Sequence, residues 1–357
     1  GDEFVVVLAE VVDSHAATSV ATQILETLRQ PIVVGAHTLR ASASIGVCFY
    51  PQDGDSRGAL MQSADIAMYH AKRAGKSTYH FYDATMMAQA SARLESERAL
   101  REAVERQLFE LHYQPQMDKT GERPVGVEAL IRWRASGGQL IAPLTFIPLA
   151  EEIGLIDAIG HWALCQACGT VARWRQNGLP ELGMAVNLSA VQLRNPALPQ
   201  ALAQLLRQTA LPGAALTLEI TESVAMQAPQ ACIERLDAIR QLGVHVAIDD
   251  FGTGYSSLAY LKRLPLDYLK LDRAFVEDLE TDSNDAAICA ATIGLAHNLG
   301  LSVVAEGVET AGQHQYLASL GCDAYQGFLF SRPLSEADAY AWLIQRVAQS
   351  HQPGAQR

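Results

Sequence analysis

The sequence has little positive charge and lacks the features of membrane-spanning or secreted proteins. Its 357 residues include 27 lysines and arginines against 39 acidic residues, a formal net charge of −12. Nucleic-acid polymers are held by basic patches, so this balance disfavours a nucleic-acid partner. No apolar run approaches the roughly 20 residues of a membrane helix, and no secretory signal is evident. We therefore expect a cytoplasmic chain without membrane contact of its own, and leave open an anchor in a longer parent protein.

Cysteine is sparse as well. The six cysteines are dispersed, and only Cys165 and Cys168 lie close together, within an apolar helical pattern where positions i and i+3 share a face. Such a pair is compatible with a redox or metal site. It is also compatible with two small core residues in a reducing compartment, which we favour.

What the sequence does contain is a regular alternation of strand and helix patterns. In residues 1–85 we predict strands at 4–10 and 43–50 and helices at 14–29 and 56–75, a small α/β unit closed by residues 77–83. Residues 86–108 are rich in strong helix formers of mixed charge, which predicts a connecting helix. We expect a large domain at 109–350 and a tail at 351–357.

The large domain has eight short apolar strands with helices in most of the gaps, which predicts an α/β fold of the TIM-like (β/α)8 barrel type. The first two strands are separated only by MDKTGERP, which is too short for a helical crossover. They should therefore pair antiparallel, giving a barrel with one antiparallel strand. The expected strands are 110–116, 125–131, 183–188, 215–220, 243–249, 267–271, 302–306 and 322–325; the expected helices are 157–177, 196–209, 228–242, 285–299, 310–319 and 335–348.

Polar residues stand at the carboxyl end of nearly every predicted strand, where barrel active sites form. One such residue could be accidental, but a full set favours a functional site. The set is Glu128, Asn187, Glu219, Asp249 with Asp250, Lys270 with Asp272, Glu306 and Gln326.

The chemistry of this set indicates bound divalent cations. Carboxylate and amide oxygens without a His or Cys cluster suit Mg²⁺ or Mn²⁺ rather than Zn²⁺. Adjacent Asp249 and Asp250 could each reach a different ion, or one could bridge two, and two ions suit phosphodiester hydrolysis. Lys270 could hold the attacking water or a phosphate oxygen. Glu306 is a candidate general base.

Seven motifs, all in order, resemble the EAL domain, a bacterial cyclic di-GMP phosphodiesterase. They are EALIRW, NLSA, EITE, DDFGTGYSSL, LKLD, AEGVE and YQGF, within residues 95–350. The resemblance implies a barrel with a reversed strand and hydrolysis of cyclic di-GMP to linear 5′-pGpG, by in-line attack of a water activated by two metal ions. No motif residue departs from the pattern, which favours catalysis over a catalytically silent cyclic di-GMP receptor.

The resemblance also implies roles for individual residues. Glu128, Asn187, Glu219 and Asp249 would hold one metal, and Asp249 with Asp250 the second. Lys270 would contact the water and Glu306 would be the base or a further metal contact. Substrate would be lined by Gln114, Leu130, Arg132, Asp272 and Gln326. The loop after the fifth strand, including Thr253 and Gly254, would be mobile and anchored by Glu222; for Glu222 alone, a solvated carboxylate at a helix start stays open.

The first residues, GDEF, together with SIGV and ADIAMYHAKRAGKSTYHFY, resemble the rear half of a GGDEF domain, the diguanylate cyclase module. Asp2 and Glu3 would be metal and catalytic positions in an intact module, and Lys72 and Lys76 phosphate contacts. The front half of that module is absent from these residues, so we expect no cyclase activity.

Two further expectations concern partners and alternatives. EAL domains often dimerise through the helix after strand five and nearby elements, so we expect a homodimer through the EAL domain. The other class of cyclic di-GMP phosphodiesterase uses a His-Asp centre, and no His-Asp dipeptide occurs in this sequence. Another metal-dependent phosphatase on the same barrel is a third interpretation, based on general chemistry alone.

Overall fold

The computed structural model describes residues 2–9, 11, 13–35, 37–135, 137–227, 229–252 and 261–350. The chain divides into two compact units, Gly1–Ala99 and Leu100–Arg357. The helix α3 (Ala84–Glu105) runs through this division, and the domain limits expected at 85 and 108 stay a prediction. No helix among the described residues is both long and apolar enough to cross a membrane. The cytoplasmic location stays a prediction.

The N-terminal unit packs a helix against a short parallel pair of strands. Its elements are α1 (Ser14–Arg29), β1 (Ile32–Val34), β2 (His37–Leu39), β3 (Ile45–Val47), α2 (Arg57–Arg73) and β4 (Tyr79–Phe81). β3 pairs with β4 in parallel, and a Cβ at Gly46 would overlap the backbone of Ala64 in α2. Glycine at position 46 therefore allows β3 and α2 to approach closely.

Two features of this unit differ from the prediction. The described residues 4–9 form no strand, and Phe4 and Val7 are 89% and 86% exposed. The strand prediction was wrong because it rested on the apolar composition alone. A strand also needs a hydrogen-bonding partner for its backbone, and no described segment pairs with residues 4–9. β1 and β2 form an antiparallel hairpin that the sequence analysis missed. Its sequence signal is weak and consists of Gly35 between two short apolar segments.

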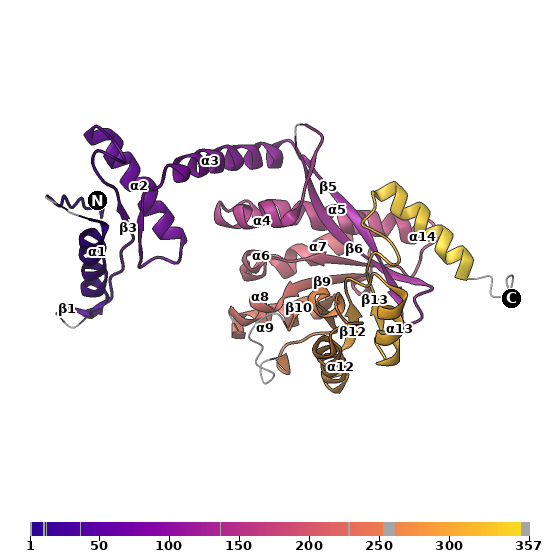
Figure 1. The fold of residues 1–357 in the computed structure, drawn as a ribbon. Coiled ribbons are helices and arrows are strands. Elements are labelled where there is room, and N and C mark those ends of the chain that lie inside the picture. Colours follow the sequence, from indigo (N-terminus) through magenta and orange to yellow (C-terminus); the bar gives the residue numbers. More distant parts are fainter. Residues whose placement is uncertain are drawn as a thin grey trace. The chain divides into compact units, whose positions relative to one another are not determined.

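The second unit is a closed barrel of eight strands, as the sequence predicted (Figure 1). The strands are β5 (Phe109–Asp118), β6 (Pro124–Arg134), β8 (Gly183–Asn187), β9 (Leu216–Thr221), β10 (His245–Phe251), β11 (Tyr268–Leu271), β12 (Ser302–Ala305) and β13 (Ala324–Tyr325). β5 is antiparallel to both of its neighbours, β6 and β13, and all other barrel pairings are parallel. The expected reversed strand is confirmed.

The reversed strand follows from the chemistry of its turn. Asp118 Oδ1 accepts hydrogen bonds from the backbone N–H groups of Thr120, Glu122 and Arg123. Gly121 takes a positive φ of 72°, a conformation that glycine adopts readily. This turn brings β6 back beside β5, with Gln114 opposite Glu128.

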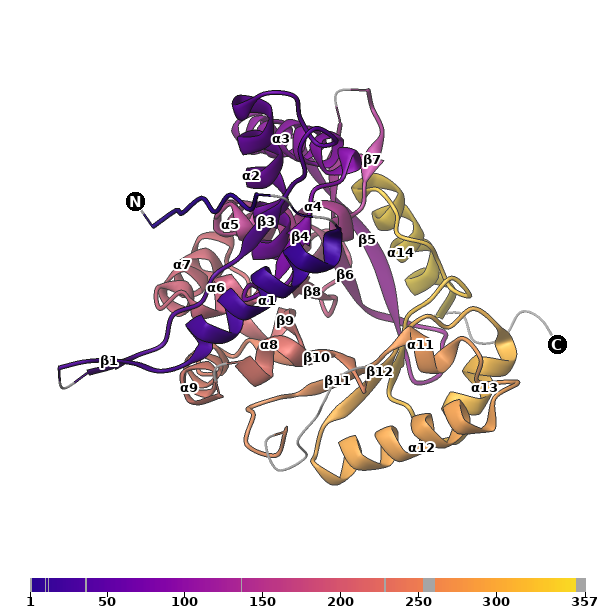
Figure 2. The ribbon, with the colours of Figure 1, turned by 60° about the vertical axis from the view of Figure 1, so that its left-hand side comes forward.

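Helices cover the outside of the barrel (Figure 2). They include α5 (Ile156–Gln176), α7 (Leu198–Thr209), α9 (Pro229–Arg240), α12 (Ser283–Asn298), α13 (Ala311–Ser319) and α14 (Glu336–Ser350). Shorter elements are β7 (Leu140–Ile141), α4 (Pro143–Glu152), α6 (Ala190–Arg194), a 3₁₀ turn (Gly213–Ala215), α8 (Glu222–Gln227) and α11 (Arg273–Val276). The sequence did not predict β7 or α4, nor the short helices α6, α8 and α11. Apolar side chains from strands and helices form one continuous core.

Within that core, Cys168 is buried in α5 and Cys165 is half-buried. Burial raises the pKa of the Cys168 thiol to about 12 and also raises that of Cys165. Thiols held in the protonated form are poor nucleophiles and poor metal ligands. These environments favour the core interpretation of the pair over the redox one.

Candidate active site

One buried lysine gathers four carboxylates at the carboxyl ends of the barrel strands. Lys270 is 1% exposed. Its Nζ lies 2.6 Å from an oxygen of Glu306, 2.7 Å from Glu219, 3.2 Å from Asp249 and 3.6 Å from Glu128. The structure thus brings together side chains that are separated by up to 178 residues in the sequence, from Glu128 to Glu306.

The strand register explains this convergence. Asn187 pairs with Glu219 across β8 and β9, and Asp249 pairs with Thr221 across β9 and β10. Because these strands are parallel, their final residues lie along the same edge of the barrel. Side chains that point inward at this level meet in its interior.

The charges of this cluster do not balance. Four carboxylates and one ammonium leave a formal charge of −3 in a buried space. Burial opposes ionisation of Glu128, but the Lys270 charge and hydrogen bonds from Gln326 and Asn187 outweigh it and lower its pKa. Burial raises the pKa of Glu306 to about 8, with the Asp249 and Glu128 charges adding to that effect against Lys270.

The pKa values of Glu219 and Lys270 reflect the same excess of negative charge. Burial, together with repulsion from the other carboxylates, raises the pKa of Glu219 well above its usual value, although Lys270 opposes this. Burial disfavours the charged form of Lys270, but the four surrounding carboxylates raise its pKa well above 10.5. A cluster that holds this much negative charge favours protons or added cations.

Asp250 and Asp272 lie beside the cluster; Asp250 is exposed and Asp272 is half-buried. Asp250 has a φ of 54°, rare for a residue other than glycine, and its N–H donates to Asp249 Oδ1 at 2.9 Å. Partial burial of its carboxyl raises its pKa to about 6, helped by the Asp249 charge and a side-chain hydrogen bond with Asp272. Asp272 also caps α11, accepting from the N–H of Ala274 at 2.7 Å.

The cluster suits a hard divalent cation in donor type and in charge. All its candidate ligands are oxygens, and the net charge of −3 would be reduced by Mg²⁺ or Mn²⁺. Asn187 donates its Nδ2 to Glu128 Oε1 at 2.6 Å, which leaves its carbonyl oxygen as an acceptor. In the described part of the chain, no three Asp, Glu, His or Cys side chains are already arranged around one point as ion ligands. The carboxylates turn toward Lys270 instead, so cation binding requires some of them to reorient.

A loop contact joins the end of β10 to the start of α8. Glu222 is 3% exposed, and its Oε2 accepts from the backbone N–H of Gly252 at 3.1 Å. The buried position disfavours the interpretation of Glu222 as a solvated carboxylate. Thr253 and Gly254, predicted in the same loop, lie outside the described residues.

Comparison with known proteins identifies the family of this chain. Residues 97–333 match the family model described as the EAL domain. This chain belongs to the EAL domain family. Residues 1–78 match the diguanylate cyclase GGDEF domain, so both expected resemblances are confirmed.

Named relatives of this EAL chain are larger proteins. It is 45% identical over 334 residues to the bifunctional diguanylate cyclase/cyclic di-GMP phosphodiesterase MucR of Pseudomonas aeruginosa, covering 94% of this chain and 49% of MucR. It is 40% identical over 334 residues to the cyclic di-GMP phosphodiesterase NbdA of the same organism, covering 94% and 42%. The chain therefore spans about half the length or less of these relatives.

Among solved structures, the EAL barrel resembles a MucR phosphodiesterase in complex with c-di-GMP. The TM-score is 0.66 at 45% identity, covering 69% of this chain and 99% of the MucR chain. The likeness covers the fold of the barrel, and the roles of the individual site residues stay predictions.

Besides Asp272, which caps α11, the residues predicted to line substrate fall into two groups in this EAL domain. Gln114 and Gln326 are buried and belong to the hydrogen-bond network around Glu128. Leu130 and Arg132 follow Glu128 on β6 at two-residue steps and are half-buried. Burial lowers the pKa of Arg132 against the opposing Glu128 charge, and its Nη1 donates to the carbonyl of Ile131 at 2.9 Å.

The predicted cyclase positions are all on the surface of the N-terminal unit. Asp2, Glu3, Lys72 and Lys76 are exposed, and Asp2 and Glu3 lie outside any strand. Their roles stay predictions.

Sequence reasoning missed Gln116, which the structure places in the network around Glu128. The sequence could have indicated its position, because Gln114 and Gln116 are two residues apart on β5 and their side chains therefore face the same side.

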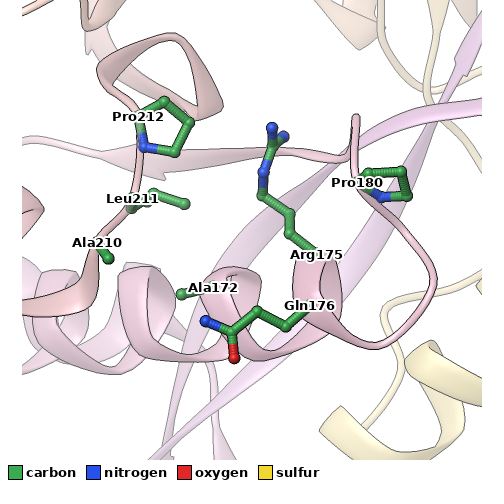
Figure 3. Close-up of a pocket in the computed structure, with 7 residues that line it drawn as sticks. All are labelled: Ala172, Arg175, Gln176, Pro180, Ala210, Leu211 and Pro212. Atoms are coloured by element: carbon green, nitrogen blue, oxygen red, sulfur yellow. The ribbon is translucent and has the colours of Figure 1, made fainter.

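A separate hollow lies between the C-terminal part of α5 and the segment before β9 (Figure 3). Arg175 lines it and donates its Nη1 to the carbonyl of Leu182 at 2.8 Å. None of its lining residues belongs to the charged cluster. The other residues that line it are Ala172, Gln176, Pro180, Ala210, Leu211 and Pro212.

Proposed function

We propose that residues 109–350 of this chain hydrolyse cyclic di-GMP to linear 5′-pGpG, in bacterial second-messenger signalling, with Mg²⁺ or Mn²⁺ bound at the strand ends. The observation that carries the proposal is the buried cluster around Lys270, whose formal charge is −3. A phosphodiester is an anion, and cations held by Glu128, Asn187, Glu219, Asp249 and Asp250 would make this acidic site able to accept it.

Two bound ions would activate the attacking water and stabilise the charge on the phosphoryl oxygens. Lys270 supplies a fixed positive charge within the cluster that could orient the water or a phosphate oxygen. Glu306 contacts Lys270 at 2.6 Å, and its pKa is raised in the metal-free cluster. Bound cations would favour its ionised form, which could then take a proton from the water.

The reaction balances with these residues. The oxygen of one water forms a bond to phosphorus, and the bond from that phosphorus to the ribose 3′ oxygen breaks. Glu306 takes the proton of the water, and the leaving 3′ oxygen takes a proton from solvent. Arg132, with its planar guanidinium near the mouth of the barrel, would hold a phosphate of the dinucleotide, and Leu130, Gln114, Asp272 and Gln326 would line it.

The test is a product assay with the purified chain. Cyclic di-GMP is incubated with MgCl₂ or MnCl₂ and, separately, with EDTA, and products are separated by liquid chromatography. We expect pGpG only with a divalent cation. Tight binding of cyclic di-GMP without pGpG would favour the silent receptor, and cleavage of other diesters without cyclic di-GMP binding would favour a general phosphatase.

We also propose that the chain forms a homodimer through its EAL domain and that its N-terminal unit has no cyclase activity. The segment expected to mediate pairing, after β10, includes residues 253–260, which lie outside the described residues. For the cyclase, incubation with GTP and Mg²⁺ should yield no cyclic di-GMP.

A further inference from the structure

Gln116 belongs to a chain of amide side chains that ends at a candidate metal ligand. It lies on β5 opposite Gly126 of β6. Its Nε2 donates to Gln326 Oε1 at 3.0 Å. Gln326 Nε2 in turn donates to Glu128 Oε2 at 2.6 Å and to Gln114 Oε1 at 3.1 Å. The NH₂ group of Gln326 therefore donates to two acceptors, Glu128 and Gln114. The side-chain carbonyl of Gln326 accepts from Gln116.

The orientation of each amide is imposed by neighbours that can only accept. Gln114 Nε2 donates to the backbone carbonyl of Ser331 at 3.2 Å, so its own oxygen faces Gln326. The Glu128 carboxylate also requires a donor from Gln326, because an ionised carboxylate has no proton to give. Gln326 must therefore turn its oxygen toward Gln116, and Gln116 must present its NH₂ group.

Loss of the Gln116 donor would remove this constraint. Gln326 is 3% exposed, so its carbonyl would be buried without a partner, which is unfavourable. The amide of Gln326 could relieve this only by turning, and a turned amide would place its oxygen against the Glu128 carboxylate. Glu128 would then lose the hydrogen bond that orients it.

We propose that Gln116 is a positioning residue for the metal site, which acts on Glu128 through Gln326 and so sets the affinity for the divalent cation. The inference rests on the proposed metal-dependent function. Hydrogen-bond partners of metal ligands typically change metal affinity or activity by about 10–100-fold when removed.

Gly126 provides the space that Gln116 occupies. A Cβ at position 126 would lie 3.1 Å from Gln116 Oε1. An alanine at this position would therefore shift the amide of Gln116 by a few tenths of an ångström without changing its chemistry. Gly126→Ala is a second way to disturb the same contact.

The experiment compares Gln116→Met, which keeps the side-chain length but has no N–H donor, with Gln208→Met on the exposed face of α7. Mn²⁺ affinity of the metal-free protein is measured by electron paramagnetic resonance, without turnover. We expect Gln116→Met to weaken Mn²⁺ binding by about 10-fold and Gln208→Met to leave it unchanged. Gly126→Ala should also weaken Mn²⁺ binding. If Gln116→Met does not fold, the Mn²⁺ affinity of Gly126→Ala tests the proposal in its place.

A double variant separates positioning from packing. If Gln116 acts through Gln326, the double variant Gln116→Met, Gln326→Met should bind Mn²⁺ no more weakly than Gln326→Met alone. Losses that simply add would overturn the proposal, as would wild-type affinity in both Gln116→Met and Gly126→Ala. Failure of the wild-type protein to bind Mn²⁺ at all would instead refute the proposed function.

Discussion

Lys270 places one ammonium among four carboxylates, of which Glu306 is half-buried and the other three are buried, and this charge imbalance is the main physical fact about the site. Removing two charges from water is already costly, and three unmatched carboxylates add to that cost. The cluster therefore reduces the stability of the metal-free fold. Bound cations would offset this cost, which links metal binding to stability.

The first prediction concerns stability and pH. Glu306 has a pKa of about 8 in the fold against 4.5 as the ordinary value, and the pKa of Glu219 is also raised. Between these values the folded chain holds protons that the unfolded chain has released, so stability falls as pH rises. The lowered pKa of Glu128 and the raised pKa of Lys270 act outside this range.

We therefore expect the melting temperature in EDTA to fall from pH 6 to pH 8, measured by scanning calorimetry. With saturating Mg²⁺ or Mn²⁺ the fall should be smaller, because cations replace the protons. A metal-free melting temperature that rises over this range would contradict the assigned electrostatics.

Prediction from sequence worked unevenly at the residue scale. The residues at strand ends could be found because the barrel fold dictates where strand ends meet. The place of Gln116 beside Gln114 could have been predicted from their two-residue spacing, but its role could not, because that role depends on which atom of the Gln326 amide faces it. The roles predicted for Leu130, Arg132 and Asp272 stay predictions.

At the scale of elements, the contact between α8 and the end of β10 provides the second prediction. Glu222→Ala removes the acceptor of the Gly252 N–H, and hydrogen bonds to charged groups contribute about 1.5–3 kcal/mol. Because Gly252 is two residues beyond Asp250, we expect weaker Mn²⁺ retention and a rate lower by about 10-fold. Both are measured by titrating Mn²⁺ in the product assay.

The matched control is Glu222→Gln, which keeps an oxygen acceptor for the Gly252 N–H and should retain most of the rate. Equal kinetics for Glu222→Ala and the wild-type enzyme would exclude the anchoring role.

The third prediction concerns the segment after β13. A Cβ at Gly327 would overlap the backbone of Val308, which accepts from the N–H of Leu329 and donates to the carbonyl of Gln326. Gly327→Ala must therefore displace Gln326 or the loop after β12. We expect a loss of about 1–3 kcal/mol of stability, seen as a lower midpoint in urea unfolding.

Gly294 in α12 is a matched control, because a Cβ added there would meet no other atom within 4 Å. Gly294→Ala should be neutral or stabilise by about 0.5–1 kcal/mol, as alanine favours helices. Equal stability of the two alanine variants would show that the close approach at Gly327 has no energetic role.

The elements that sequence predicted best are those with strong periodicity and a fixed place in the barrel. The reversed strand was predictable because its short link excludes a crossover. The strand expected at 4–10 was wrong because apolar composition does not supply a pairing partner. The hairpin of β1 and β2 was missed because its strands have three residues each and are exposed, which leaves no alternation of burial.

At the scale of the whole molecule, the acidic chain and its proposed anionic substrate are compatible only through local cations. The net charge of −12 disfavours anions in general. A cation site at the barrel mouth would make the attraction local and dependent on metal, so added EDTA should weaken cyclic di-GMP binding as well as hydrolysis.

The fourth prediction is the assembly state. We expect light scattering coupled to gel filtration to give about twice the mass of one chain at micromolar concentration. A monomeric mass under these conditions would contradict the proposed homodimer, without affecting the proposed chemistry of the barrel.

The central claim is that the cluster around Lys270 is the site of cyclic di-GMP hydrolysis. Glu128→Ala tests it most directly, with Glu181→Ala, an exposed acid on the same barrel domain, as control. The rate of pGpG formation is measured at saturating Mg²⁺ or Mn²⁺, with melting temperatures to confirm folding. We predict a loss of at least about 100-fold for Glu128→Ala, equivalent to about 2.7 kcal/mol, and an unchanged rate for Glu181→Ala. A folded Glu128→Ala enzyme with the wild-type rate would contradict the claim.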